Sequence, residues 1–295
     1  MSMINVMRRL IILSTIFFIP ITTSAEYALV ADYVIDGKSD DPLENKVILI
    51  SGKKIISIIN IDAIPEKYTV INLPGTTLMP GMVNAHEHPL LYQSDYQNGH
   101  LQASSAFKAL IGLKTLQRLL ASGWTSIRVM GDGDIYYANQ DIRKAIDRNM
   151  FLGPRLTGAA HYISITGGGG DINYLSPEQA VIADGLIADG PHEIRKAIRQ
   201  EIKFGSDWIK IMVTGAFMSV GDNPENVSFS PEELRAAVEE AARHNIPVAA
   251  HAHATEGINQ AVIAGVRSIE HGSFLSHESI DLMVEYGTYL VPTIY

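Results

Sequence analysis

The sequence predicts an α/β protein built on parallel strands, preceded by a small β module. From residue 76 onward, amphipathic helical stretches alternate with short apolar strands. Histidines and one lysine fall at or near the ends of several of these strands. Barrels of parallel strands carry their sites at that end. We therefore expect a (β/α)8 barrel of the TIM type, seven strands of which are present in this chain; an open doubly wound sheet is the alternative.

The first 25 residues are expected to be a signal peptide. Two arginines at positions 8 and 9 precede a mostly apolar run over residues 10–19, and small residues suited to cleavage end the segment at Ala25. The apolar run is shorter than the roughly 20 residues of a transmembrane helix. We therefore expect an exported protein, periplasmic or secreted, with no stable membrane span after cleavage.

Composition restricts the function further. The chain has 295 residues, 46% of them hydrophobic, which is enough for a large core. Its 23 basic residues are outnumbered by 32 acidic ones, which argues against nucleic acid as a partner. The absence of cysteine excludes thiolate catalysis and cysteine-based zinc sites.

Residues 26–75 are expected to form a small β-sandwich module, part of a composite domain whose C-terminal part is missing from this chain. Three runs rich in β-branched residues, 27–35, 46–51 and 54–61, are separated by Gly- and Asp-containing turns.

Helix boundaries are marked in the barrel region, which is expected over residues 76–295. A residue suited to a left-handed helix end precedes five of the strands: Gly123, Gly205, Asn245, Gly265 and Gly287. Helix starts are predicted where a serine precedes a proline, with Glu or Gln two residues further on, at Ser176 and Ser230.

The strands so delimited are seven, and the barrel is expected to be truncated after the seventh. They are expected over residues 77–84, 125–130, 155–160, 208–213, 248–252, 266–270 and 289–294.

Lys210 lies within the apolar segment 208–213, so its ammonium is expected to be buried, which is costly unless something neutralises it. Addition of CO2 to the amine would give a carbamate, which is an anionic metal ligand. Alternatively the lysine extends to solvent at the barrel mouth or pairs with a carboxylate. Taken alone, this alternative is the commoner case.

Two histidine pairs and a single histidine accompany this lysine. His86 and His88 follow the first strand and His251 and His253 end the fifth; residues two apart on a strand point the same way. His271 ends the sixth strand. Each histidine alone would be an ordinary hydrogen-bonded residue, but their occurrence in order at strand ends predicts a metal site.

This ordered set resembles the amidohydrolase superfamily, most closely its prolidase-like and imidazolonepropionase-like branch, which also includes ochratoxin-cleaving amidases. The resemblance rests on segments 78–88, 208–210, 251–253 and 269–272 and on the glycine-rich loop 166–171. Relatives often carry a histidine in that loop where this chain has Gly169, which bears on substrate preference.

The resemblance implies two divalent metal ions, zinc by default. The first would be held by His86 and His88 and the second by His251 and His271, with Lys210, carrying a CO2-derived carbamate, as the bridge. His253 and His161 are expected to contact the substrate.

The implied reaction is hydrolysis of an amide bond in a dipeptide or an N-acyl amino acid by a metal-bridging hydroxide. The alternatives are a cyclic-amide (imidazolone-type) hydrolase and a non-catalytic metal-binding remnant. The family's general base is an aspartate that ends the eighth strand, which this chain does not contain, and the spacing of Asp171 and Glu87 places neither as its substitute. The catalytic residue therefore stays unassigned, and the expected partners are the small substrate and, as a possibility, a second copy of the chain.

Overall fold

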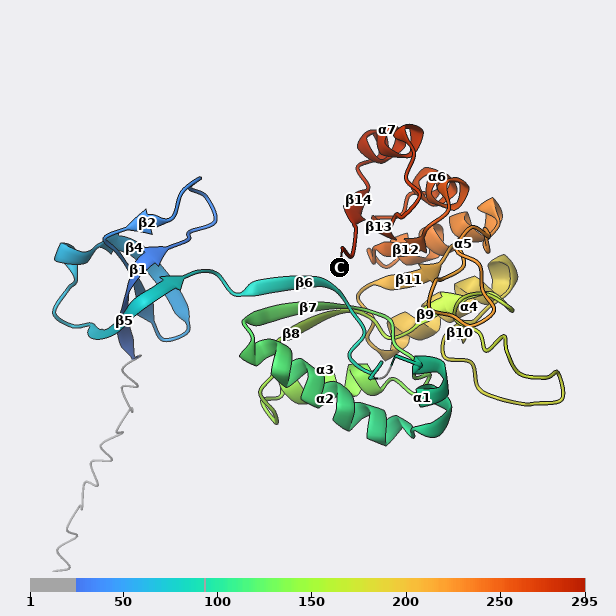
Figure 1. Cartoon of the computed structure of the whole chain (residues 1–295), viewed down its shortest axis with the longest axis horizontal. Coiled ribbons are helices and arrows are strands. Elements are labelled where there is room, and N and C mark those ends of the chain that lie inside the picture. Colours follow the sequence, from blue (N-terminus) through green and yellow to red (C-terminus); the bar gives the residue numbers. More distant parts are fainter. Residues whose placement is uncertain (1–24, 93, 295) are drawn as a thin grey trace, which may run out of the picture. The chain divides into compact units, whose positions relative to one another are not determined.

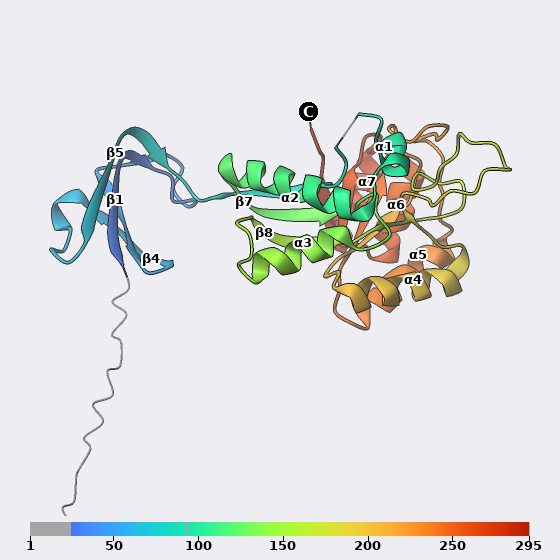
Figure 2. The same ribbon diagram turned by 90° about the horizontal axis from the view of Figure 1, so that it is seen from below.

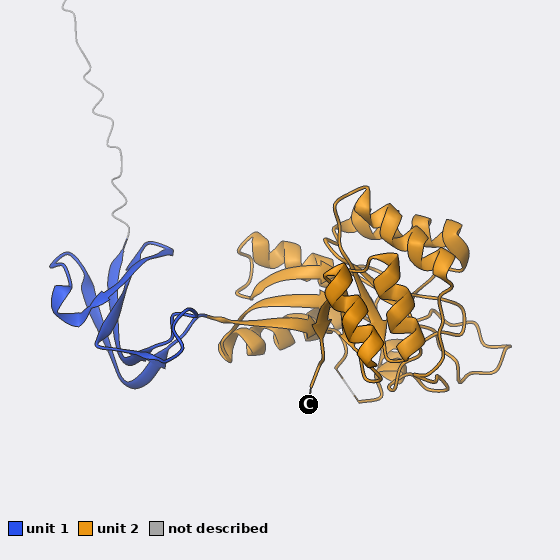
Figure 3. Ribbon diagram, turned by 90° about the horizontal axis from the view of Figure 1, so that it is seen from above, with its two compact units in different colours: residues 1–80 blue, residues 81–295 orange. Residues whose placement is uncertain are grey.

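The structure is a computed structural model that describes residues 25–92 and 94–294. The expected signal peptide therefore lies outside the described residues, except for Ala25. The chain divides into two compact units, one ending at Pro80 and the other beginning at Gly81 (Figure 3). Among the described helices, none combines the length and apolar character that a membrane crossing requires.

The first unit is a single five-stranded sheet (Figure 1). The order is β2-β1-β3-β4, with β5 parallel to β1. The expected sandwich is not confirmed, because the described residues form one sheet rather than two packed sheets. The strands are β1 (Glu26–Val34), β2 (Leu43–Glu44), β3 (Lys46–Ser51), β4 (Lys54–Asn60) and β5 (Thr69–Leu78), and a short helix, η1, covers Ile61–Ala63.

The fifth strand was not predicted, and it moves the end of the unit from residue 75 to Pro80. Pro74 and Gly75 were interpreted as the end of the β module. The strand passes through them because its pairing with β1 tolerates an irregularity between Ala31 and Tyr33. The Asp32 carboxylate accepts a hydrogen bond from Gly75 N (3.1 Å) at that point.

The second unit contains the predicted parallel strands in two sheets, β6-β7-β8 and β10-β9-β11-β12-β13-β14 (Figure 1). Their bounds are β6 (Met82–Glu87), β7 (Trp124–Met130), β8 (Arg155–Ala159), β9 (Tyr162–Ser164), β10 (Leu186–Ile187), β11 (Ile209–Met212), β12 (Val248–Ala252), β13 (Ser268–His271) and β14 (Tyr289–Val291). All seven predicted strands are present, although the first begins later than expected, because residues 77 and 78 belong to β5.

The two sheets adjoin where β8 gives way to β9. Gly158 O accepts hydrogen bonds from Asp207 N (3.1 Å) and Trp208 N (3.3 Å), which lie just before β11. Strands β8 and β9 together therefore fill the third position of one parallel series. Among the described residues no strand pair joins β6 to β14, so the series is open and a closed barrel is not seen.

The helices cover the outer face of these strands (Figures 1 and 2). Helices α2 and α3 form one apolar core with β7 and β8, and helices α4 to α6 form another with β11 to β13. The bounds are α1 (Tyr96–Gln102), α2 (Ser105–Ala121), α3 (Ala138–Asp147), α4 (Gly190–Phe204), α5 (Pro231–Ala242), α6 (Thr255–Ala264) and α7 (His277–Tyr286). The left-handed conformation is confirmed at all five predicted helix ends, and Ser230 forms the predicted capping box.

The prediction of a helix starting at Ser176 was wrong. Residues 176–185 contain no helix and no strand, and are irregular apart from a turn at 177–178 and a bend at 184–185. The fully buried Asp184 accepts a hydrogen bond from Tyr162 Oη (2.8 Å), and Gly185 N donates to Gly170 O (2.8 Å). These tertiary contacts hold the segment against β9 and outweigh the local capping signal.

Candidate metal centre

The five predicted metal ligands and His253 converge at the carboxyl ends of the parallel strands. His86 and His88 come from the end of β6, Lys210 from β11 and His271 from β13. A cavity of about 470 Å³ opens there. Its polar wall contains His88, Lys210, His251, His253, His271, Ser273 and Thr293.

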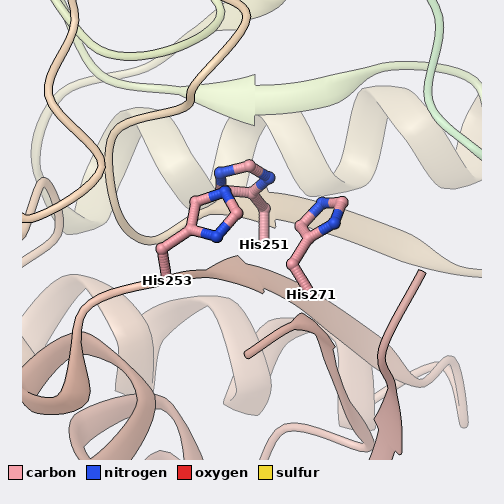
Figure 4. A group of neighbouring side chains, drawn as sticks. All are labelled: His251, His253 and His271. Carbon is pink, nitrogen blue, oxygen red and sulfur yellow. The ribbon is translucent and has the colours of Figure 1, made fainter. Parts of the chain in front are cut away.

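Three histidines form a compact group (Figure 4). Ligand nitrogens of His251, His253 and His271 all lie within 4.8 Å of one another. His251 and His271 were the expected metal ligands, whereas His253 was expected to contact substrate. The structure places His253 with the other two, so three ring nitrogens rather than two are available to an ion.

His86 and His88 face each other in a way that suits a shared cation. Their Nε2 atoms are 3.0 Å apart. His86 Nδ1 lies 2.7 Å from the Glu270 carboxylate and His88 Nδ1 lies 2.6 Å from Gly131 O. Because both acceptors require a proton on Nδ1, both Nε2 atoms present lone pairs. Two lone pairs at this separation repel each other unless a positive charge lies between them.

His251, His253 and His271 are also each held by a hydrogen bond through one ring nitrogen. His251 Nε2 donates to Gly215 O (3.1 Å). His253 Nδ1 bonds Ser273 Oγ (2.8 Å) and His271 Nδ1 bonds Thr293 Oγ1 (2.7 Å). Each ring thus has one nitrogen fixed by the protein and the other free, which is the usual arrangement of histidines that bind metal.

Burial keeps these imidazoles neutral. It lowers the pKa of His88 and of His253 to about 4 and that of His271 to about 2, with the Lys210 charge adding to the effect. The pKa values of His86 and His251 are lowered as well, chiefly by burial. Metal binding requires neutral imidazole, so these rings are in the binding form at neutral pH.

Lys210 is 1% exposed and lines the cavity. Burial lowers its pKa to about 8, although the Glu270 charge opposes the shift. The unprotonated amine, which is the form that can add CO2, is therefore more populated near neutral pH than it is for a solvent-exposed lysine. The donor set of neutral imidazoles, with a buried lysine beside them, thus fits divalent cations.

Sequence reasoning missed a buried carboxylate and a buried guanidinium at this centre. Glu270 is fully buried and bonds both His86 and Arg128, which reaches it from β7. The signal for both was present, since each is a charged residue that directly follows an isoleucine in a predicted strand of the barrel region.

His161 does not contact the cavity, contrary to the expectation that it binds substrate. It is fully buried, and its Nδ1 lies 2.5 Å from Glu201 Oε1 while its Nε2 lies 2.7 Å from Asp134 O. Both ring nitrogens are therefore used by the protein. Asp171 and Glu87 bond neighbouring groups and are not in the cavity wall.

Asp184, behind the cavity wall, supplies a pH-dependent prediction. Burial raises the pKa of Asp184 to about 6, against about 3.9 in an unfolded chain. The free energy of unfolding is therefore highest when the Asp184 carboxyl is protonated. This contribution is complete below about pH 3.9 and is lost as the pH rises through about 6. Asp184→Asn keeps an acceptor for Tyr162 and removes the buried charge. We expect the variant to be about 1–3 kcal/mol more stable than the parent at pH 7.5, but not at pH 4.

Urea unfolding at the two pH values measures this difference. The control is Asp147→Asn, which makes the same charge change at an exposed position at the end of α3. A loss of stability in Asp184→Asn at pH 7.5 would contradict the prediction.

Fold and site together define an α/β protein with a candidate metal centre at the carboxyl ends of its parallel strands. The particular family follows from comparison with known proteins. The amidohydrolase family model matches residues 77–295, and the chain belongs to this family.

Ochratoxinase from Aspergillus niger is 32% identical to this chain over 311 residues, which cover 98% of the chain and 62% of that protein. A crystal structure of a Xaa-Pro dipeptidase with bound methionine in the active site is 34% identical, with a TM-score of 0.82 over 91% of this chain and 67% of that one. The A. niger ochratoxinase structure has a TM-score of 0.77 over 92% of this chain and 65% of its own. The chain thus spans about three fifths of the length of these curated relatives.

Proposed function

We propose that this protein is a binuclear metal-dependent hydrolase that cleaves an amide bond in a dipeptide or an N-acyl amino acid. The observation that carries the proposal is the set of five histidines, each with one nitrogen anchored and one free, around a buried lysine of lowered pKa. Family membership supports it, as does the similarity to ochratoxinase and to the Xaa-Pro dipeptidase.

The proposed ligands are His86 and His88 for one ion, His251 and His271 for the other, and a Lys210 carbamate between them. His253 is close enough to join the second set. Two bound divalent ions, with zinc as the default, would lower the pKa of water and polarise the scissile carbonyl. The protein holds each imidazole in its neutral form and directs its free nitrogen inward.

The proposed substrate carries an apolar group beside the amide bond. Opposite the polar wall, the cavity is lined by Leu91, Tyr96, Tyr162, Met212, Ala216, Phe217, Met218, Pro292 and Ile294. The Phe217 ring lies 4.6 Å from the His253 ring, so an apolar side chain packed on Phe217 would lie next to the candidate metal ligands. Gly169 adds no side chain to this wall. A Cβ at this position would lie only 3.0 Å from Met212 Cε, so a larger residue would narrow the cavity.

The test is an assay of zinc-loaded protein on apolar Xaa-Pro dipeptides and N-acyl amino acids. We expect release of the amine product, its loss on treatment with a chelator and its recovery when zinc is added back. Turnover of imidazolone-type rings alone would favour the cyclic-amide alternative. Uptake of zinc without any turnover would favour the non-catalytic one.

We further propose that the open strand series belongs to an eight-stranded barrel and that the protein is exported and its signal peptide cleaved after Ala25. The seven strands in predicted order and the structural likeness to family members support the barrel. Sequencing the coding DNA beyond Tyr295 tests for an eighth strand ending in aspartate. N-terminal sequencing of protein recovered outside the cytoplasm tests the cleavage, and a retained Met1 would contradict it.

A further inference from the structure

Arg128 and Glu270 form a buried ion pair inside the strand series, next to the candidate metal centre. Arg128 Nη2 donates to Glu270 Oε1 at 2.7 Å, and the two side chains are 9% and 0% exposed. Breaking such a pair is costly, because it leaves an unpaired buried charge. A pair in this position therefore needs a full set of partners.

The remaining donors of Arg128 connect strands that are not neighbours in the sheets. Its Nε donates to Ala85 O on β6 (2.6 Å), and its Nη1 donates to Ser268 Oγ on β13 (3.3 Å). Its guanidinium lies 4.5 Å from the ring of Trp208, which directly precedes β11. One side chain from β7 thus holds both the strand that carries His86 and the strand that carries Glu270.

The two oxygens of Glu270 have different partners. Oε1 accepts from Arg128 Nη2 and from Ser268 Oγ (2.6 Å). Oε2 lies 2.7 Å from His86 Nδ1. With Oε1 fully occupied by two donors, Oε2 is left to accept the Nδ1 proton of His86. This bond selects the tautomer in which His86 Nε2 has a free lone pair, 3.0 Å from His88 Nε2.

We propose that Arg128 and Glu270 are positioning residues that fix the tautomer and ring orientation of His86, and with them the affinity of the His86–His88 metal position. This inference rests on the proposed metal site. It adds that one of the two positions depends on a pair that contacts neither ion nor substrate.

The chain contains a matched control in Glu201 and His161. Glu201 is a fully buried carboxylate that bonds a histidine Nδ1, as Glu270 does. The other nitrogen of His161 is bonded to Asp134 O, away from the cavity. Glu201→Gln therefore carries the same burial and the same chemical change without touching the candidate site.

The decisive variant is Glu270→Gln. Its amide oxygen is held by Arg128 and Ser268, which are both donors, so its NH2 group faces His86 Nδ1. That nitrogen must then accept, and the proton moves to Nε2, which has to lose this proton before it can bind a metal. We expect zinc affinity at one of two positions to fall about 10- to 100-fold, with the other unchanged.

Competition of the full-length chain with a chromophoric chelator measures both zinc affinities in the parent, Glu270→Gln and Glu201→Gln. The control is expected to lose thermal stability without any change in affinity. Two unchanged affinities in Glu270→Gln would overturn the proposal. If the unsubstituted protein bound no zinc, that result would contradict the proposed function instead. The inference on Arg128 and Glu270 would then be decided by the tautomer of His86.

The tautomer is measured in the metal-free parent by long-range ¹H–¹⁵N correlation of the histidine rings, which needs no variant to fold. We expect the proton of His86 on Nδ1. A proton on Nε2 would overturn the proposal whatever the zinc measurements give. Arg128→Lys retains the charge, but its donors all lie on one nitrogen, whereas Arg128 reaches its three partners from three different nitrogens. This variant is expected to weaken the preference for Nδ1.

Discussion

Lys210→Ala is expected to lose most of the bound metal. In the proposed site the lysine carbamate is the one ligand shared by both ions, and no other described residue in the cavity wall offers an anionic oxygen. Its removal leaves only neutral imidazoles to balance two dications. We expect the stoichiometry after dialysis to fall from about two zinc ions per chain to one or fewer, and affinity to fall by more than about 100-fold.

Elemental analysis of dialysed protein measures the loss. Added short-chain carboxylates are expected to restore part of it, because they can occupy the vacated space and bridge the ions. Lys108→Ala serves as the control: Lys108 is also buried, but it bonds Gly133 O and His100 outside the cavity wall. Two zinc ions retained in Lys210→Ala would show that the lysine is not a ligand.

Gly158→Ala is expected to cost the second unit about 4 kcal/mol or more of unfolding free energy. Gly158 has a φ of +134° and pairs with Val129 of β7. A Cβ at this position would lie 1.9 Å from Val129 O, a backbone atom that cannot rotate away. The same residue joins the two sheets through its bonds to residues 207 and 208, so the substitution disturbs the joint on which the site is built.

Gly287→Ala is the matched control for this prediction. Gly287 also has a positive φ, +68°, but a Cβ there would meet nothing within 4 Å. It should cost only about 1 kcal/mol, the strain of the left-handed conformation. Urea unfolding of both variants separates the cost of the steric clash from the cost of the left-handed backbone. Equal losses of unfolding free energy in the two variants would show that the sheets can shift to accept the added methyl group.

Much of the fold could be predicted from local patterns. Helix ends at Gly205 and Gly265 and the capping box at Ser230 were legible because backbone conformation there depends on one or two residues. The same holds for the apolar strands, whose burial on both faces leaves a continuous hydrophobic run. The helix wrongly predicted at Ser176 and the unpredicted β5 are the places where distant contacts outweighed these local preferences.

By itself, the sequence determined which residues could bind metal: histidines at strand ends and one lysine in an apolar strand. The tertiary structure alone decided how they are used. It placed His253 with His251 and His271, and it buried His161 away from the cavity, where the ring bonds Glu201. It also brought Arg128 and Glu270 together from strands 142 residues apart. Spacing along a strand sets the direction of a side chain, whereas its partners across the sheet depend on how all the strands pack.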